Sequence, residues 1–518
     1  MCSPLFEFVA NSVIPKKIDT GATMFNALGI VSNYIIVLLM GIYTFSCFSI
    51  FAKSSERVKK RILIRQNVVM FLIHFIAFFV MFVRTGDERL IGLYATQVVL
   101  FLATILLYNI AYPRVSRLIV NNMCMLVCIG YIMLARLNFD EATNQFLFGV
   151  LGVSFGLFVP IIIKKFKFLS RWRWVYAIIG IAALVSVAIF ADPEGGAMRW
   201  FNIAGFGIQP SEIVKILFVF FVAACLVYST SIKDLFITSI FAGVHVIILV
   251  WSVDLGTSVT LFVVYLIMVY VATRNVLYTF AGIGFGAFAA WAGYHMFAHV
   301  RVRVAVWQDP LYDYFGAGNQ LSNSLFAIGS GGWFGLGLHG GDPNTIIHVT
   351  RDFMFSAIVE ELGIIFGLCL ILICVSCYVM FLNIAMELKQ PFYKFVALGL
   401  GTTYIFQVFL TIGGAIALIP STGVTLPLVS YGGSSFMSTM VMFGIIQGLY
   451  ILRQDEEEDL EYRKREFDEE MERNQSSRRD PVVGRRTHSD EGFEPVGRGR
   501  RHREEEPTFE EVPKQRIR

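Results

Sequence analysis

Thirteen segments of this sequence are apolar enough and long enough to cross a lipid bilayer, and this feature constrains the fold more than any other. A helix needs about 20 mostly apolar residues to span a hydrocarbon core about 30 Å thick. Of the 518 residues, 56% are hydrophobic and 16% are charged, whereas soluble domains carry about 25% charged residues. A transmembrane barrel would instead show short strands of alternating polarity. The sequence therefore predicts an all-α polytopic membrane protein.

Charged or turn-rich breaks separate the predicted helices. The helices cover residues 26 to 51, 66 to 84, 89 to 112, 116 to 136, 146 to 163, 173 to 191, 212 to 229, 235 to 252, 257 to 272, 277 to 297, 353 to 382, 391 to 418 and 434 to 452. The N-terminus lacks a basic start followed by a compact apolar core, so no cleavable signal peptide is predicted.

Basic clusters predict the orientation of the chain. Lys and Arg concentrate at residues 52 to 65, 112 to 117, 164 to 173 and 386 to 394, which all fall on the same side of this threading. The positive-inside rule assigns that side to the cytoplasm. The N-terminus is then expected outside, the C-terminus inside, and residues 298 to 352 form a large outer loop.

The composition changes abruptly after the last predicted helix. Residues 453 to 518 are highly charged and contain few apolar residues. They are expected to form a disordered cytoplasmic tail, with room for a short charged helix at its start. Two interpretations stay open, a solvated tail or a tail that docks a specific partner.

Most of the conspicuous polar residues gather on the predicted outer side. They are Arg199, Gln209, Ser211, Glu212, Lys215, Asp254, Arg301, Arg303, Asp309, Asp313, Asp352, Glu360 and Glu361. A charge at membrane depth costs roughly 2.5–3.5 kcal/mol on insertion scales, so such residues pair, line a cavity or take part in chemistry. Mutual neutralisation is one interpretation. The alternative is an outward-facing cavity in which Arg and Lys hold phosphate groups.

The set as a whole favours the cavity and suits a lipid-linked phosphorylated substrate. A pyrophosphate needs cations at the membrane surface, and an isoprenoid tail needs a groove between helices. Two Gly-rich passages, at residues 329 to 341 and 430 to 435, lack the strand and helix context of a nucleotide-binding loop. They serve either as close turns or as loops that expose backbone N–H groups to a substrate. No nucleic-acid partner is predicted.

Six motifs, in order and at matching spacing, resemble the shape, elongation, division and sporulation (SEDS) family of bacterial polytopic glycosyltransferases. The motifs are MRWFNIAGFGIQPSEIVK (198 to 215), DLGTS (254 to 258), RVAVWQDPLYDYFGAGNQ (303 to 320), AIGSGGWFGLGLHG (327 to 340), RDFMFSAIVEELG (351 to 363) and IPSTGVTLPLVSYGGSS (419 to 435). The resemblance implies a ten-helix core over residues 116 to 452 that polymerises lipid II into glycan strands outside the bacterial cytoplasmic membrane. Residues 1 to 115 then form an N-terminal extension with about three additional transmembrane helices.

The same resemblance implies a catalytic role for Asp313, which precedes an FGxGxQ-like turn. Asp313 is expected to accept the proton of the acceptor sugar's 4-hydroxyl as that oxygen attacks the donor's anomeric carbon, with inversion and loss of the polyprenyl pyrophosphate. Asp309 ranks second as the base. Arg199, Lys215 and Arg303 are expected to stabilise the leaving group, although the arginines could instead anchor a helix end or pair with Glu212. The other predicted substrate-binding residues are Gln209, Ser211, Glu212, Asp254, Gln320, Asp352, Glu360, Ser430, Tyr431, Gly432, Gly433 and Ser434.

No cofactor and no metal ligand set is predicted, and the involvement of a divalent cation is left open. The resemblance implies a class B penicillin-binding transpeptidase as a partner, and the tail offers a contact for other division or elongation proteins. Two other functions stay open: a lipid II flippase that uses the same cavity for transport, and a noncatalytic scaffold of a cell-wall synthesis complex.

Overall fold

The computed structural model describes residues 20–53, 55–166, 168–190, 201–203 and 206–479, and in these residues thirteen helices are long and apolar enough to span a membrane. This confirms the predicted all-α membrane fold. The spanning helices are α2 (Thr20–Ser49), α3 (Glu56–Thr85), α4 (Arg89–Ala111), α5 (Arg117–Leu137), α6 (Phe139–Lys165), α7 (Arg173–Phe190), α8 (Pro210–Tyr228), α9 (Ile232–Trp251), α10 (Leu255–Thr273), α11 (Val276–Met296), α14 (Met354–Glu387), α15 (Pro391–Ala415) and α16 (Gly433–Arg479). The shorter elements are η1 (Leu169–Arg171), β1 (Phe201–Ile203), β2 (Phe206–Ile208), α12 (Ala298–Gln308), α13 (Asn319–Gly331) and η2 (Pro343–Thr345).

Local chemistry explains where individual helices begin and end. The side chain of Asn138 caps α6 by accepting hydrogen bonds from the backbone amides of Asp140 (3.1 Å) and Glu141 (3.2 Å). These two acids occupy the first turn, and Lys164 and Lys165 occupy the last. Both placements complement the helix dipole. Helix α6 therefore begins about two turns before the apolar run that predicted it.

The helices divide into a buried group and a lipid-facing group. Nearly every residue of α5 is buried, and most of the spanning windows of α8, α15 and α16 are buried as well. In contrast, α11 has no buried residue, and fewer than a third of the residues in the spanning windows of α4, α7 and α9 are buried. The exposed side chains of these outer helices are mainly large and apolar, as expected where lipid is the solvent.

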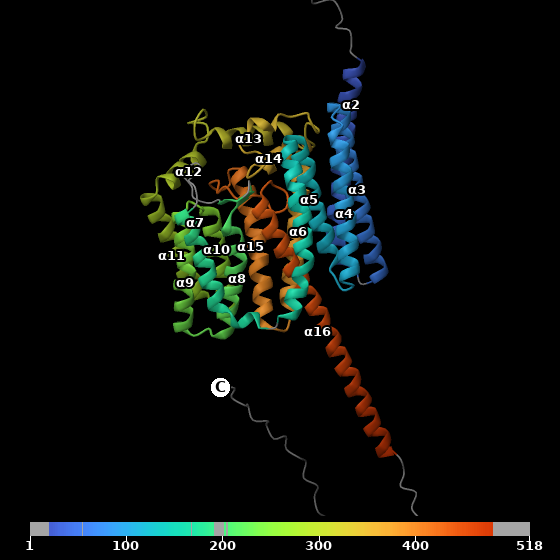
Figure 1. Cartoon of the computed structure of the whole chain (residues 1–518), viewed down its shortest axis with the longest axis vertical. Helices are drawn as coiled ribbons and strands as arrows, with labels where there is room; N and C mark the ends of the chain where they lie inside the picture. Colours follow the sequence, from blue (N-terminus) through green and yellow to red (C-terminus); the bar gives the residue numbers. More distant parts are fainter. Residues whose placement is uncertain (1–19, 54, 167, 191–200, 204–205, 480–518) are drawn as a thin grey trace, which may run out of the picture. The chain divides into compact units, whose positions relative to one another are not determined.

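The connections between helices lie at two opposite ends of the bundle (Figure 1). We call one end the basic face, because it carries the connections at 50–53, 112–116, 168–172 and 388–390. The opposite end, the loop face, carries α12, α13, η2 and the connection between α15 and α16. The short charged helix that was expected after the last span is longer in the structure, because α16 continues without interruption to Arg479.

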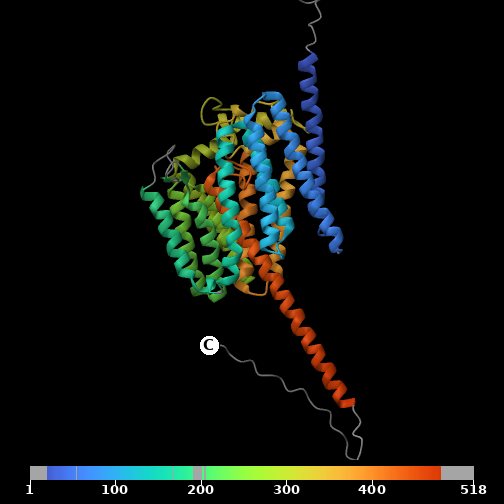
Figure 2. The ribbon, with the colours of Figure 1, turned by 45° about the vertical axis from the view of Figure 1, so that its right-hand side comes forward.

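The N-terminal extension, α2 to α4, packs along one side of the other helices in both views (Figures 1 and 2). A buried polar network joins α2 and α3 of the extension to α5 and α14. Asn122 on α5 accepts hydrogen bonds from the Tyr43 hydroxyl (3.2 Å) and the Cys47 thiol (3.2 Å) on α2, and it donates to the Ser376 hydroxyl (3.3 Å) on α14. Gln66 on α3 donates to the same thiol (3.3 Å). Polar bonds of this kind hold helices together where lipid removes the hydrophobic drive for association.

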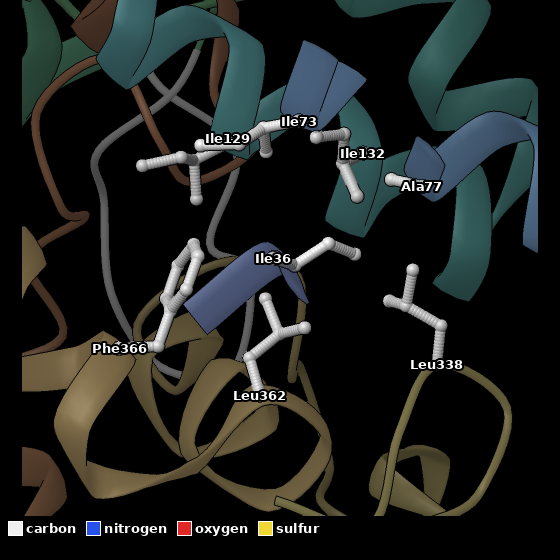
Figure 3. Close-up of a pocket in the computed structure, with 8 residues that line it drawn as sticks. All are labelled: Ile36, Ile73, Ala77, Ile129, Ile132, Leu338, Leu362 and Phe366. Carbon is white, nitrogen blue, oxygen red and sulfur yellow. The ribbon is translucent and has the colours of Figure 1, made fainter. Parts of the chain in front are cut away.

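Apolar side chains complete this junction nearer the loop face. Figure 3 shows Ile36 from α2, Ile73 and Ala77 from α3, and residues of α5 and α14 pointing toward one another around a small cavity. The cavity has a volume of about 10 Å³, which is at the lower limit for a single water molecule. This part of the junction, between α2, α3, α5 and α14, is therefore closely packed, and the cavity has no room for a ligand.

Helix α14 is interrupted at Gly363, where φ is 88° and ψ is 166°. Only glycine adopts this conformation readily. The loop between α13 and α14 fills the break, and its Leu336 and Gly337 amides donate to the carbonyls of Glu360 (2.9 Å) and Glu361 (2.8 Å). Backbone groups that the break exposes at membrane depth are thus paired with another backbone segment, as a membrane protein requires.

Candidate active site

The connection between α15 and α16, residues 416 to 432, forms the centre of the loop face, and we call it the central loop. Its side chains Leu426, Leu428 and Val429 are at most 2% exposed. The central loop also lies directly against α5, because a Cβ atom at Gly130 would be 2.6 Å from the carbonyl oxygen of Val429. The central loop is therefore packed into the bundle, and the positions of the surrounding polar residues are described relative to it.

A first polar group surrounds Asp254, at the start of α10. Its Oδ1 accepts a hydrogen bond from the Thr257 amide (3.2 Å), which caps the helix. Its Oδ2 accepts from the Ser211 hydroxyl (2.9 Å) and from the Gln209 side-chain amide (3.2 Å) at the start of α8. Both Asp254 and Ser211 are buried. The carboxylate thus joins the loop-face ends of α8 and α10.

The start of α8 is also attached to α16. The antiparallel pair β1 and β2 leads into Gln209, whose amide donates to the Ser434 hydroxyl (2.9 Å). Ser434 in turn donates to the carbonyl of Gly207 (3.0 Å) on β2. In the structure, three of the predicted substrate-binding residues therefore hold the loop-face ends of α8, α10 and α16 together. They are Gln209, Ser211 and Ser434.

Lys215 lies deeper on α8, in a buried ion pair with Glu212 (Nζ to Oε2, 2.8 Å). Its ammonium also donates to the Gln407 side chain on α15 (2.7 Å), and Glu212 accepts from the Ser438 hydroxyl on α16 (2.9 Å). The geometry is that of mutual neutralisation, one of the two interpretations open from sequence. This network joins three helices beneath the central loop.

A second polar group lies where α12 meets the central loop. The Arg303 guanidinium donates to the carbonyl of Ser421 (2.7 Å), and the Trp307 indole donates to the carbonyl of Ala417 (3.0 Å). Asp352, just before α14, is near enough to Arg303 for their charges to interact. Burial raises the pKa of Asp352, and the positive charge of Arg303 is one of the influences that oppose this rise. Arg303 is thus attached to the central loop, and Asp352 lies within range of its charge on the loop face.

Asp313 is exposed in the turn between α12 and α13. Its Oδ2 accepts a hydrogen bond from the Ala317 amide (2.8 Å), and its carbonyl accepts from Gly316 and Gly318. Asp309 is likewise exposed, and its carboxylate caps the start of the same turn. Both carboxylates therefore shape this turn on the side of the molecule where Arg303 and Asp352 lie.

The two acids of α14 bind the α13–α14 loop. Glu361 is fully buried and forms an ion pair with Arg136 on α5 (2.8 Å), and it also accepts from the His339 amide (3.1 Å). Glu360 accepts from the Asp342 amide (3.0 Å). These acids hold the loop that fills the break in α14.

The Gly-rich end of the central loop makes its backbone hydrogen bonds within the protein. The Tyr431 amide donates to the carbonyl of Thr350 (2.7 Å), and the Gly432 amide is 3.4 Å from the Gln145 side chain on α6. The Ser430 hydroxyl accepts from Leu426. These contacts favour the close-turn interpretation of residues 430 to 435. Gln320, on α13, similarly donates to the carbonyl of Ile347 (2.6 Å).

One predicted residue cannot be placed, and two participants were missed. Arg199 lies outside the residues that the structure describes. Gln407 and Arg136 are central to the networks around Lys215 and Glu361, yet the outer-loop pattern did not include them. The signal that would have found them is a polar residue within, or at the end of, an otherwise apolar span. Within the described ranges, no three His, Cys, Asp or Glu side chains converge on a metal site.

Comparisons with known proteins agree with this architecture. Residues 115–454 match the model of the FtsW/RodA/SpoVE family, described as cell cycle proteins. The peptidoglycan glycosyltransferase RodA of Mycobacterium bovis is 30% identical over 369 residues, which cover 64% of this chain and 77% of that protein. The probable peptidoglycan glycosyltransferase FtsW of Shewanella sediminis is 30% identical over 331 residues, which cover 60% of this chain and 80% of that protein.

A solved structure shares the fold. It is described as "Structural coordination of polymerization and crosslinking by a peptidoglycan synthase complex", and it aligns with a TM-score of 0.55 at 21% identity, covering 66% of this chain and 98% of its own. The family match covers well over half of the chain, and the relatives are aligned over most of their length. The protein therefore belongs to the FtsW/RodA/SpoVE family.

Proposed function

We propose that this cell-wall glycosyltransferase polymerises lipid II into glycan strands at the loop face, and that the loop face is the outer side of the bacterial cytoplasmic membrane. The observation that carries the proposal is the hydrogen bond from Arg303 to the central loop, with Asp352 within range of the Arg303 charge, on the same face as the exposed Asp313. The basic connections occupy the opposite face, which supports a cytoplasmic assignment for that face. The N-terminus would then be outside and the C-terminus in the cytoplasm.

In the proposed reaction Asp313 is the general base. Its Oδ2 is held by the Ala317 amide, which orients Oδ1 for a hydroxyl group. The acceptor's 4-hydroxyl gives its proton to this carboxylate as its oxygen forms a bond to the donor's anomeric carbon. The bond from that carbon to the pyrophosphate breaks, and the electron pair leaves with the polyprenyl pyrophosphate. Attack opposite an α-linked leaving group gives a β linkage.

Arg303 is the cation best placed to stabilise the developing charge on the pyrophosphate. A guanidinium has five N–H donors in a planar fork, so it can hold the Ser421 carbonyl and a phosphate oxygen together. The negative charge of Asp352, which is within range of the guanidinium, would favour this position. Lys215 is a weaker candidate for direct contact than the sequence suggested, because its buried ammonium is neutralised by Glu212. We assign it a supporting role beneath the central loop.

The proposal includes a class B penicillin-binding transpeptidase as the partner that crosslinks the new strand. The support is the fold shared with a structure described as a peptidoglycan synthase complex that polymerises and crosslinks. A second candidate function, lipid II transport, is favoured by the break in α14 beside two acids, since transporters place broken helices at their binding sites. Against transport, the break lies near the loop-face end of α14 and is filled by the α13–α14 loop.

The test is reconstitution of the purified protein with labelled lipid II, with and without its transpeptidase, and measurement of glycan-strand length. Asp313→Asn should reduce the rate by at least about 10²-fold, the lower range for a positioned general base. Asp309→Asn is the matched control, because it changes an exposed acid in the same turn, and it should retain most of the activity. Equal polymerisation by wild type and Asp313→Asn would remove Asp313 from the mechanism. Wild-type protein that translocates lipid II without polymerising it, even with the partner, would favour transport.

A further inference from the structure

A second cavity opens at the basic face, at the opposite end of the bundle from the candidate active site. It has a volume of about 660 Å³, within the range of roughly 300–1,000 Å³ that is typical of ligand pockets. Its walls are the end of α4 with the connection that follows, the end of α6, and α16. The cavity therefore lies where the N-terminal extension meets the family core.

The wall of this cavity is positively charged. Arg114, Lys164 and Lys165 line it together with a single acid, Asp455. Asp455 accepts from Lys164 (2.7 Å) and from Arg114, which also pairs with Glu458. Lys165 is exposed and makes no ion pair within the part of the chain that the structure describes. Of the three positive charges in the lining, Lys165 is thus the one without an acidic partner among the described residues, and the cavity keeps a net positive charge.

Polarity changes along the cavity in the direction of the membrane normal. On α6, Pro160 and Ile161 line the cavity four residues before Lys164 and Lys165, and on α16 an isoleucine likewise precedes Asp455 by four residues. Four residues of helix advance about 6 Å. The apolar half therefore lies toward the hydrocarbon core, and the cationic half lies at the depth where spanning helices end and headgroups begin.

We propose that this cavity binds the headgroup of an anionic phospholipid. The phosphate would contact Lys164 and Lys165, and the first part of the acyl chains would pack against Ile161 and Ile451. Basic pockets between transmembrane helices bind acidic lipid headgroups in this way. A free phosphate ion would satisfy the lysines, but it would leave the apolar half of the cavity unused. The site is separate from the proposed catalytic site and does not rest on the proposed function.

The experiment uses the purified full-length protein and native mass spectrometry, with phosphatidylglycerol and phosphatidylcholine as the lipid probes. Wild type should bind phosphatidylglycerol in preference. Lys164→Gln/Lys165→Gln should weaken that binding about thirtyfold, because each basic residue near a membrane surface contributes roughly a fivefold change in affinity. Lys165→Gln alone, which breaks no ion pair, should weaken it about fivefold. The matched control is Arg57→Gln/Lys60→Gln, which removes two exposed charges from the start of α3 at the same face and should have little effect.

Three results would overturn the proposal. The first is equal binding of the two lipids by wild type. The second is an equal loss of phosphatidylglycerol in the control and in Lys164→Gln/Lys165→Gln, since general surface charge would then explain the binding. The third is displacement of the lipid by millimolar inorganic phosphate, which would make this a site for free phosphate. Normal thermal stability of Lys165→Gln, measured in parallel, shows that its effect arises from the site and not from misfolding.

Discussion

Replacing Lys215 by methionine should destabilise the protein far more than replacing a lysine in an ion pair of the same length at the surface. Lys215 is 2% exposed, and its ammonium is 2.8 Å from the carboxylate of Glu212. Without it, Glu212 keeps only the hydrogen bond from Ser438 and becomes an uncompensated buried charge. Breaking a buried pair by removing one partner typically costs about 3–5 kcal/mol. The free energy of unfolding should fall by about that amount.

The chain provides a matched control at the start of α3. Lys59 and Glu56 form an ion pair with the same i,i+3 spacing and the same 2.8 Å distance, but the Glu56 side chain is 83% exposed. Exposed pairs contribute at most about 1 kcal/mol, so Lys59→Met should have little effect on stability.

The double variant Glu212→Gln/Lys215→Met separates the loss of the pair from the burial of an unpaired charge. It should be considerably more stable than Lys215→Met, because removing both charges avoids the desolvation cost of one alone. Unfolding can be followed with a fluorogenic thiol reagent, because the seven cysteines in the described residues are all free and buried. If Lys215→Met and Lys59→Met lower the stability equally, or if the double variant is no better than Lys215→Met, the burial argument is refuted.

Two further predictions concern the α13–α14 loop. Burial, with the nearby charges of Arg136 and Arg84, lowers the pKa of His339 to about 4, so below its ordinary value of about 6.5 the unfolded chain binds a proton that the folded protein does not. Stability should therefore be lost as the pH falls from about 6.5 toward 4, and His339→Asn should lose less over that window in thermal unfolding; identical pH profiles would contradict this. Asn33 on α2 donates to backbone carbonyls of this loop. Asn33→Leu should therefore lower the free energy of unfolding by about 1–3 kcal/mol and speed amide hydrogen exchange at Gly337. Unchanged exchange would show that α2 does not stabilise the loop.

Hydropathy alone predicted the number of spanning helices, because each helix must satisfy its own backbone in lipid and therefore needs an unbroken apolar run. It placed helix ends less well. The predicted segment 146 to 163 became Phe139–Lys165, because the polar first turns of α6 are held by the Asn138 cap rather than by apolar burial. The break at Gly363 was also not predicted, because a glycine after two acids does not by itself end a helix, and the docked loop is what makes the interruption stable.

The sequence predicted that the polar residues lie on one side of the membrane, but it did not predict which of them contact one another. For Lys215 both neutralisation within the bundle and stabilisation of the leaving group were open, and neither interpretation named Gln407, which the structure places at its ammonium together with Glu212. A neighbour on the same helix can be read from i,i+3 spacing. A neighbour 192 residues away, as Gln407 is from Lys215, depends on how α8 and α15 pack. The sequence singled out Glu361 but not its partner Arg136 for the same reason, because their contact depends on how α5 and α14 pack.

The packing of α2 against α14 has a consequence for any partner of this enzyme. Lipid offers apolar helices no hydrophobic reason to associate, so buried polar contacts decide which helices stay together. Asn122 contacts α2 and α14 at once, through Tyr43, Cys47 and Ser376, and Asn33 adds a contact from α2 to the loop that fills the α14 break. A transmembrane helix that approached α14 from this side would have to pack on α2 or displace it. Displacement would remove Tyr43 and Cys47, the two α2 donors to the Asn122 side-chain oxygen, in a medium that supplies no replacement. Such a partner is therefore expected to recognise the extension itself, or to bind α14 from a different side.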